Sequence, residues 1–217
     1  MGDSVGPTEP AEGSAAPGPD GRRRCLWALR SQDELHYHDT EWGRPVRDEA
    51  GMLERVCLEG FQAGLSWLVV LRKRPALREV FHGFDPAAVA AMSDVELEQL
   101  LTDVRVIRSH RKIAAVRANA RATLTLAAHG DSLSGLVWRH APESGAGVAP
   151  TTVAEVPANT AASAQLATQL REAGFRFVGP TTAYATMQAV GLVNDHLRDC
   201  FVRQHGMSDS TPGSVSG

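Results

Sequence analysis

Apolar side chains recur three and four positions apart through most of the chain, which is the spacing of a helix that buries one face. Strict alternation of apolar and polar residues is scarce, and the β-branched residues are scattered. The pattern therefore predicts an all-α domain over residues 23–205. We expect the helices in the middle of the chain to form one lobe, and the segments near the two ends to form a second.

Local capping signals predict where individual helices begin and end. The expected starts are Asp48, Ser66, Pro75, Asp85-Pro86 and Ser93, and the later helices are expected over 108–128, 161–173 and 180–190. Ser66 is expected to cap a short helix that ends near Leu71, and Pro75 suits the first position of a separate helix. Ser93 with Glu96 is typical of a capping box. Gly174 and Gly191 follow the last two helices, where glycine commonly ends a helix.

The two ends of the chain differ in composition from the part between them. Residues 1–22 are rich in Gly, Pro, Ala, Ser and acidic side chains, and residues 206–217 have a similar composition. Such segments have little apolar surface to bury, so both are predicted to be disordered tails. A Gly/Pro loop is expected over residues 144–150.

Charge and hydropathy exclude little apart from a membrane protein. The net charge of the 217 residues is −3; residues 1–21 hold four acidic and no basic side chains, which leaves +1 for the rest. This balance argues neither for nor against binding to nucleic acid. No apolar run approaches the roughly 20 residues that span a bilayer. The start of the chain lacks the apolar centre of a secretory signal. We expect a cytoplasmic protein, with a monomer as the default.

The cysteines and histidines allow a metal site. The chain has three cysteines, and an odd number without a secretory signal argues against a disulfide framework. His196 and Cys200 are four residues apart, so on a helix they share a face. Cys25 and His38 would complete two thiolates and two imidazoles, a common ligand set for structural zinc. The alternative is ordinary thiols and unrelated histidines, which the wide spacing alone favours.

Aromatic residues are concentrated around one carboxylate in the first third of the chain. Three of the four tryptophans fall within residues 27–67, together with Tyr37 and Glu59. An aromatic slot with one carboxylate suits a flat, electron-poor or cationic ring. The alternative is that the tryptophans belong to the core and that Glu59 pairs with an arginine. Gly64 is expected to end the helix that contains Glu59, and Leu65 to lie on an exposed turn.

The segment from Gly174 to Ala183 lies between two predicted helices and is similar to the helix-hairpin-helix turn of DNA repair proteins. At such a turn, glycine lets the backbone approach DNA closely, and free N–H groups at the helix start attract a phosphate. Gly179 is the candidate for this close approach. An ordinary turn between helices is the alternative.

Taken together, these stretches closely resemble the DNA-3-methyladenine glycosylase I family of the helix-hairpin-helix glycosylase superfamily. The matching segments are Arg24-Cys25 with Trp27, Tyr37–Gly43, Leu58–Trp67, Val106–Arg108, Lys112-Ile113, Asn119–Arg121, Gly174–Val178 and Gly191–Cys200. They cover roughly residues 24–200 in order. The resemblance implies a helix-hairpin-helix glycosylase fold in which a structural zinc ties the two terminal segments together. It assigns the zinc to Cys25, His38, His196 and Cys200.

The resemblance also implies roles for the aromatic slot and the two turns. The residue at Glu59 hydrogen-bonds the methylated adenine and is the catalytic candidate. The expected base-binding residues are Tyr37, Trp67, Trp27 and Trp42. The Gly64-Leu65 turn is expected to fill the duplex after the base leaves, and Gly179 to grip the DNA backbone.

The expected activity is therefore hydrolysis of the N-glycosidic bond of 3-methyladenine in alkylated double-stranded DNA. We expect no strong general base, because Asn194 takes the place of an Asp common in the superfamily and Asp195 is one position away. No lysine is placed to form a Schiff base, so strand nicking is not expected. A non-catalytic lesion-binding protein is the alternative. A zinc hydrolase is disfavoured, because four protein ligands leave no open position for water.

Overall fold

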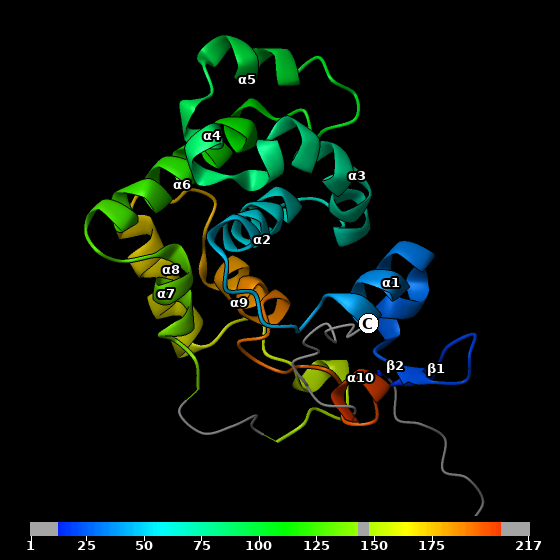
Figure 1. Cartoon of the computed structure of the whole chain (residues 1–217). Coiled ribbons are helices and arrows are strands. Elements are labelled where there is room, and N and C mark those ends of the chain that lie inside the picture. Colours follow the sequence, from blue (N-terminus) through cyan, green and yellow to red (C-terminus); the bar gives the residue numbers. More distant parts are fainter. Residues whose placement is uncertain (1–12, 143–147, 205–217) are drawn as a thin grey trace, which may run out of the picture.

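The computed structural model describes residues 13–142 and 148–204, which form ten α-helices and one short ladder (Figure 1). The helices are α1 (Gln32–Thr40), α2 (Glu49–Gln62), α3 (Trp67–Val80), α4 (Pro86–Ala91), α5 (Asp94–Leu100), α6 (His110–Ala128), α7 (Leu133–Trp138), α8 (Ala161–Glu172), α9 (Pro180–Ala189) and α10 (Phe201–Gln204). Short 3-10 helices are η1 (Leu26–Arg30), η2 (His82–Phe84) and η3 (Val153–Glu155). The predicted all-α class is confirmed.

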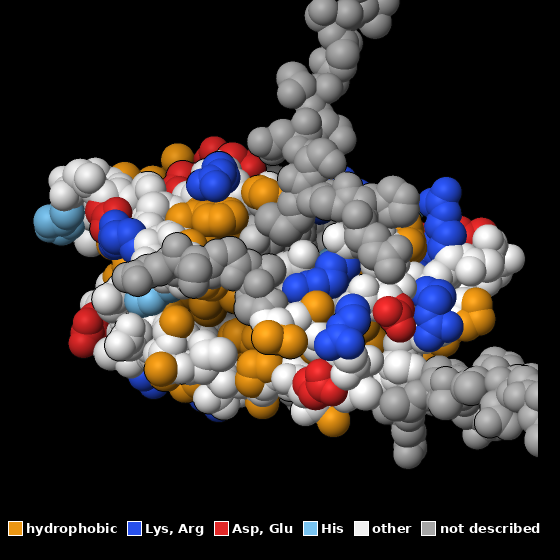
Figure 2. All heavy atoms as spheres, turned by 90° about the horizontal axis from the view of Figure 1, so that it is seen from below, with side chains coloured by type: hydrophobic (Ala, Val, Ile, Leu, Met, Phe, Trp, Pro, Cys, Tyr) orange, Lys and Arg blue, Asp and Glu red, His pale blue; other side chains and the backbone are white. Residues whose placement is uncertain are grey.

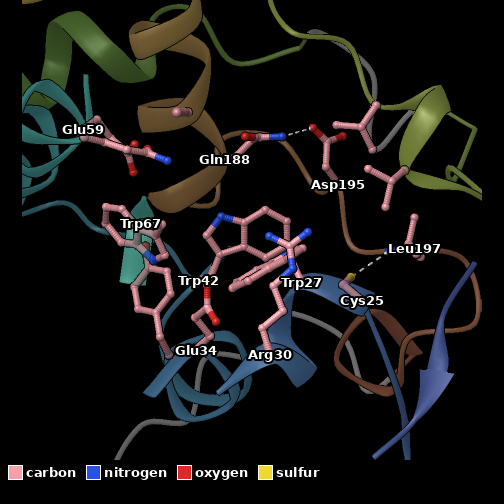
Figure 3. A pocket seen from close by; sticks show the side chains of 15 residues that line it. Cys25, Trp27, Arg30, Glu34, Trp42, Glu59, Trp67, Gln188, Asp195 and Leu197 are labelled. Carbon is pink, nitrogen blue, oxygen red and sulfur yellow. Dashed lines mark hydrogen bonds between the residues drawn. The ribbon is translucent and has the colours of Figure 1, made fainter. Parts of the chain in front are cut away.

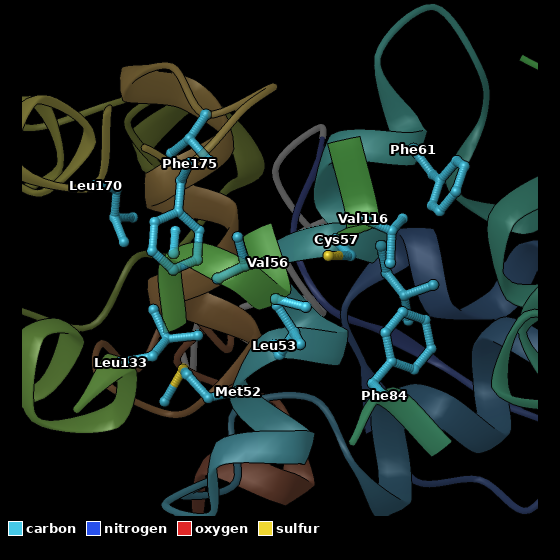
Figure 4. Close-up of a cluster of buried hydrophobic side chains, with 14 of the residues drawn as sticks. Met52, Leu53, Val56, Cys57, Phe61, Phe84, Val116, Leu133, Leu170 and Phe175 are labelled. Carbon is cyan, nitrogen blue, oxygen red and sulfur yellow. The ribbon is translucent and has the colours of Figure 1, made fainter. Parts of the chain in front are cut away.

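Helix α2 is the central element of the molecule. Every residue from Met52 to Phe61 is buried, so this helix is covered on all sides. It contacts α3, α6, α7 and α9. Figure 4 shows how the core extends to both sides of α2: Leu133, Leu170 and Phe175 lie on one side, and Phe84 and Val116 lie on the other. The residues on α2 that bear function are therefore held by a rigid support.

Several predicted helix starts are confirmed by their caps. The Asp48 side chain accepts a hydrogen bond from the Gly51 N–H. Asp85 does the same for Ala88, and Ser93 and Glu96 form a capping box. These starts could be predicted because a cap involves only residues three positions apart.

The predicted break at Pro75 is wrong, since α3 runs without interruption through this residue. Pro75 is exposed, so its ring lies toward solvent, while the opposite face buries Val70, Arg74 and Leu77. Arg74 also forms ion pairs with Glu54 and Glu41, 2.6 and 2.8 Å between the nearest atoms. This anchoring outweighs the backbone hydrogen bond that proline removes.

The predicted amino-terminal tail must be corrected in its second half. Strand β1 (Ala16–Pro17) pairs antiparallel with β2 (Arg23–Arg24), and Ala15 is buried. The anchor is the buried Arg24, which binds the carboxylates of Asp20 and Asp39 at 2.5 and 2.8 Å. Composition missed this order because ion pairs, backbone contacts and a single buried alanine supply it, rather than an extensive apolar surface. The rest of the tail predictions, and most of the predicted loop over 144–150, fall on residues 1–12, 143–147 and 205–217, outside the described residues.

The two ends of the described chain meet in a small second cluster. Ala15, Cys25, Leu197 and Cys200 are buried together, with Trp27 and Trp42 packed against them. In Figure 1, β1, β2 and α10 lie together at the bottom of the molecule, and α1 lies above the two strands. The association of the terminal segments is thus confirmed, although α8 and α9 belong to the large core. None of the helices in the described ranges has the length and apolar composition needed to cross a bilayer.

Candidate functional site

Four candidate metal ligands come together between the two ends of the chain. The ligand atoms of Cys25, His38, His196 and Cys200 all lie within 4.8 Å of one another, and all four residues are buried. His38 is presented by α1, and Cys25 precedes η1. The alternative of ordinary thiols and unrelated histidines is therefore wrong for these four. The third thiol, Cys57, is buried on α2 and contacts Asn119 instead.

Three distances within the cluster fit a tetrahedral ion, while Cys25 Sγ lies somewhat farther from His196 Nδ1, at 4.0 Å. His196 Nδ1 lies 3.2 Å from His38 Nε2 and 3.6 Å from Cys200 Sγ, while Cys200 Sγ lies 3.4 Å from His38 Nε2. Zinc bonds of ordinary length give tetrahedral edges of about 3.3 Å between two nitrogens and about 3.6 Å between nitrogen and sulfur. Two thiolates would also neutralise a divalent cation. The donor set and its geometry therefore fit a metal ion with four protein ligands.

The non-ligating groups around this cluster are also satisfied. His38 Nδ1 lies 2.8 Å from Asp39 Oδ1, which leaves Nε2 directed into the cluster. Asp39 is fixed by Arg24, and His196 Nε2 lies 3.3 Å from the Trp42 carbonyl. The Leu197 N–H donates to Cys25 Sγ at 3.4 Å. Such outer partners orient metal-binding imidazoles and thiolates.

A pocket of about 330 Å³ opens beside this cluster (Figure 3). Its volume falls within the roughly 300–1,000 Å³ usual for small-molecule sites. Glu59 and Trp67 lie at one end, and Asp195 and Leu197 lie at the other. The lining also includes Cys25, Trp27, Arg30, Glu34, Tyr37, Trp42, Gln62, Val153, Val156, Ala185 and Gln188. The metal cluster and the pocket therefore share a wall.

Aromatic rings form much of that wall. Tyr37 and Trp67 have ring centroids 5.2 Å apart at 47°, and Trp27 and Trp42 are 5.1 Å apart, edge to face. Trp42 also lies 4.6 Å from the His196 ring. The three tryptophans pack against the two core clusters but are only partly buried, and all three line the pocket. Their exposed surface faces a cavity in which a flat ring can be enclosed.

Glu59 is a buried carboxyl group without a partner. It is 7% exposed, and among the residues that the structure describes it forms no hydrogen bond or ion pair. The nearby Arg55 pairs with Glu41 at 2.9 Å, so the alternative that Glu59 pairs with this arginine is wrong. Burial raises the pKa of Glu59 to about 8, an effect that the Arg55 charge opposes.

Two further polar groups at this end of the pocket are unpaired. Tyr37 Oη and Trp67 Nε1 are both buried and have no hydrogen-bond partner within the described ranges. An unpaired buried donor destabilises a protein by about 1–3 kcal/mol, so such groups are uncommon without a functional reason. Together with Glu59 they provide hydrogen-bonding capacity that the protein itself does not use.

Asp195 is held differently at the opposite end. Its Oδ2 accepts hydrogen bonds from Tyr184 Oη at 2.6 Å and from Gln188 Nε2 at 2.8 Å. Neither of these partners was predicted, because the contacts of Gln188 with the pocket and of Tyr184 with Asp195 depend on how α9 packs. Glu34 was also missed, although Ser31 three residues earlier gives the local signal of a helix start, and the two side chains bond at 3.0 Å.

The turn after α2 has the predicted exposed form. The Leu65 N–H donates to the Gln62 carbonyl at 2.7 Å, and Gly64 has φ +77°, the conformation that favours glycine in a type II turn. Leu65 is 39% exposed. The turn therefore presents an apolar side chain to solvent next to the end of α2 that carries Glu59.

The predicted hairpin lies between α8 and α9. Gly174 has φ +101° and follows α8, while Gly179 caps α9 in an extended conformation. A side chain at position 179 would point into open space, so the backbone conformation there does not itself require glycine. The absence of a side chain instead leaves the backbone at the start of α9 accessible.

The surface charge is mixed. On the face shown in Figure 2, basic and acidic side chains are interspersed among hydrophobic ones. This agrees with the net charge of −3. A ligand would therefore be guided by local contacts rather than by a broad field of one sign.

Comparison with known proteins matches this arrangement. A family model described as methyladenine glycosylase matches residues 27–204. DNA-3-methyladenine glycosylase 1 of Escherichia coli strain K12 is 46% identical over 179 residues, which cover 82% of this chain and 95% of the relative. A crystal structure of a 3-methyladenine DNA glycosylase I is 43% identical with a TM-score of 0.79 and covers 82% of this chain and 98% of that one. A Staphylococcus aureus structure that addresses 3-methyladenine recognition is 30% identical with a TM-score of 0.77, over 82% and 95% of the two chains.

Proposed function

The chain belongs to the DNA-3-methyladenine glycosylase I family, and from that premise we propose which of its residues bind and release the base. It is a DNA glycosylase of base-excision repair that acts on 3-methyladenine in alkylated DNA. The single observation that carries our assignment is the unpaired, buried carboxyl group of Glu59 at the end of an aromatic pocket.

We propose that the pocket recognises 3-methyladenine by both charge and shape. Methylation at N3 makes the adenine ring of the nucleotide cationic. Stacking on an aromatic side chain stabilises a bound base by about 1–3 kcal/mol, and a cation is attracted to the face of an aromatic ring. Tyr37 and Trp67 supply the stack, and Trp27 and Trp42 complete the walls.

Glu59 adds selectivity because its carboxyl group lacks a partner in the free protein. A cationic ring beside it favours the ionised form and lowers the pKa that burial raises. The carboxylate then accepts hydrogen bonds from the edge of the methylated base. Normal adenine carries no charge, so it would not favour the ionised form of Glu59.

The reaction needs little help from a general base. The bond between C1′ and the ring nitrogen breaks with its electron pair moving to the cationic ring, which leaves neutral. A water oxygen bonds to C1′ and passes one proton to solvent. Asp195 lies at the far end of the pocket with one oxygen held by Tyr184 and Gln188, so we propose that it helps to shape the pocket and does not accept the proton of the water.

Two exposed turns are proposed to hold the DNA. Leu65 is apolar and exposed on the Gly64 turn, so it is suited to fill the space that a flipped base leaves. The open backbone at Gly179 and the start of α9 are suited to a phosphate. Flipping a damaged base costs only a few kcal/mol.

We propose zinc as the ion of the Cys25, His38, His196 and Cys200 cluster, with a structural role. Four protein ligands leave no open position, so the ion would tie the terminal segments together and take no part in hydrolysis. We further propose that the protein acts as a monomer in the cytoplasm, where the DNA of its bacterial relatives is found.

The test is release of free base from methylated duplex DNA by the wild type, Glu59→Ala and the surface control Glu172→Ala. We expect 3-methyladenine from the wild type and the control. Glu59→Ala should be roughly 10- to 100-fold slower, which corresponds to the loss of a charged hydrogen bond. Wild-type binding to methylated DNA without release would instead indicate a lesion-binding protein.

The proposed role of Asp195 is tested in the same assay. Asp195→Asn should retain most of the activity, because asparagine preserves the shape and one accepting oxygen. Complete loss of cleavage, with the metal still bound and the fold intact, would identify Asp195 as a required base.

A further inference from the structure

Two polar side chains of α6 bind the backbone of the two turns proposed to contact DNA. Lys112 Nζ donates to the Phe61 carbonyl at 2.9 Å and to the Ala63 carbonyl at 2.5 Å. These carbonyls belong to the end of α2 and the start of the Gly64 turn, where backbone oxygens lack helical partners. Lys112 therefore holds the start of the turn that carries Leu65.

The position of Lys112 within α6 supports this interpretation. It lies in the first turn of the helix, where a positive charge opposes the helix dipole. The C-terminus of α2 is the end at which a cation is favourable. The charge thus stabilises α2 and its turn rather than the helix that bears it.

Asn119 makes the corresponding contact with the hairpin. Its Oδ1 accepts from the Arg176 N–H at 2.7 Å, and its Nδ2 donates to the Arg176 carbonyl at 3.4 Å. Both backbone groups of one hairpin residue are therefore held by a buried side chain. The next residue, Phe177, has φ +55°, which costs a non-glycine residue about 1–3 kcal/mol and must be stabilised by its surroundings.

The two contacts lie on the same support. Residues 112 and 119 are seven positions apart on α6, which is two helical turns or about 10.5 Å. Between them, Gly60 of α2 packs against the hairpin so closely that an added Cβ would lie 3.3 Å from Phe177 Cβ. Neither Lys112 nor Asn119 lines the base pocket.

We propose that Lys112 and Asn119 are positioning residues that fix the distance between the Leu65 turn and the Gly179 hairpin. Helix α6 then acts as a spacer that sets how the two turns meet one duplex. The inference rests on the proposed function, because it concerns how that function is applied to double-stranded DNA. It predicts a defect that depends on the duplex and spares recognition of the free base.

The experiment compares Lys112→Met with Lys73→Met. Lys73 is the only other lysine of the chain, and it also donates to a backbone carbonyl, that of Val104 at 2.8 Å, which belongs to neither turn. We expect Lys112→Met to lower kcat/KM on methylated duplex DNA about 10- to 100-fold, the effect of a small misplacement of a reacting group. Activity on methylated single strands should change less than threefold, and Lys73→Met should match the wild type on both.

Two further measurements separate positioning from a general loss of structure. Binding of free 3-methyladenine, followed by tryptophan fluorescence, should be unchanged in Lys112→Met. Lys112→Arg should restore most of the duplex activity, because arginine can also donate to two carbonyls. Asn119→Asp, which keeps the acceptor and loses the donor, should show the same selective defect in a smaller degree.

Equal activity of Lys112→Met and Lys73→Met on duplex DNA would overturn the inference and leave the proposed function intact. Loss of free-base binding together with duplex activity would overturn it as well, since the lysine would then support the whole fold. If the wild type released no base, the proposed function would fail. In that case, the affinity for a duplex that contains an abasic-site analogue would still decide the inference. We expect Lys112→Met to bind this duplex about tenfold more weakly than Lys73→Met.

Discussion

The metal cluster and the base pocket share a wall but treat their polar atoms in opposite ways. In the cluster, each ligand atom faces the others, and the second nitrogen of each imidazole has its own partner. In the pocket, Glu59, Tyr37 Oη and Trp67 Nε1 have no partner anywhere in the described part of the chain. The first region is organised to hold its shape, whereas the second keeps bonding capacity for a ligand.

The contrast follows from what each region must do. Unpaired buried groups destabilise the free protein, so they persist only where the surrounding structure is strong enough to hold them. Here that support includes the ion pairs of Glu54 and Glu41 with Arg74 on the adjacent α3, and the satisfied cluster on the other side. The comparison predicts that changes to the cluster affect stability most, and that changes to the pocket affect binding and the pH dependence of stability.

The largest effect is expected when a metal ligand is removed. Cys200→Ala leaves three ligands for the ion and breaks the link between the two ends of the chain. We expect a loss of more than about 4 kcal/mol of unfolding free energy, or roughly 8–16 °C in Tm. Calorimetry and metal analysis of the purified protein measure this. Cys57→Ala is the matched control, because Cys57 is equally buried but lies outside the cluster, and it should keep its metal. Equal metal content in both variants would contradict the assignment.

A smaller and pH-dependent effect is expected from Glu59→Gln. Burial raises the pKa of Glu59 from 4.5 to about 8, so the folded state holds its proton at pH values where the unfolded state has lost it. Stability from this group is present below pH 4.5 and is lost as pH rises toward 8. Glutamine removes that dependence. The unfolding free energy of the variant, relative to that of the wild type, should therefore rise by about 3 kcal/mol between pH 5 and pH 8. Urea unfolding at both pH values measures this difference in free energy. The same difference at pH 5 and pH 8 would show that folding does not raise the pKa of Glu59.

The smallest effect is expected from Tyr37→Phe. The hydroxyl has no partner in the described residues, so its removal should change the unfolding free energy by less than about 1 kcal/mol. If the hydroxyl bonds the ligand, affinity for free 3-methyladenine should fall by up to about tenfold. Urea unfolding and a fluorescence titration measure the two quantities. A clear loss of stability without a loss of affinity would place the hydroxyl in the structural network instead.

The fold could be predicted from the sequence where local signals decide it. The caps at Asp48, Asp85 and Ser93 depend on residues three positions away, and all three were correct. Pro75 misled because α3 is held by buried contacts with other helices. The order of residues 13–22 was missed because it rests on Arg24 and its two carboxylates rather than on composition.

The site was predictable to a different degree in each part. Spacing alone favoured unrelated cysteines and histidines, because the ligands Cys25 and His196 are 171 residues apart, and only the family resemblance joined them. The aromatic residues around Glu59 were visible as a local concentration. Gln188 and Asp195 could not be placed, since their contact with the pocket depends on the packing of α9.

The wide separation of the cluster's ligands also has a consequence for how the protein is made. Synthesis proceeds from the amino terminus, so Cys25 and His38 leave the ribosome long before His196 and Cys200 exist. The shared wall of the base pocket cannot be completed until the last ligands have been added. A chain cut short before Asp195 would thus have most of its core but would lack the pocket-lining residues Asp195 and Leu197 and two of the four ligands. Completion of the chain and competence to remove a base are therefore coupled in time.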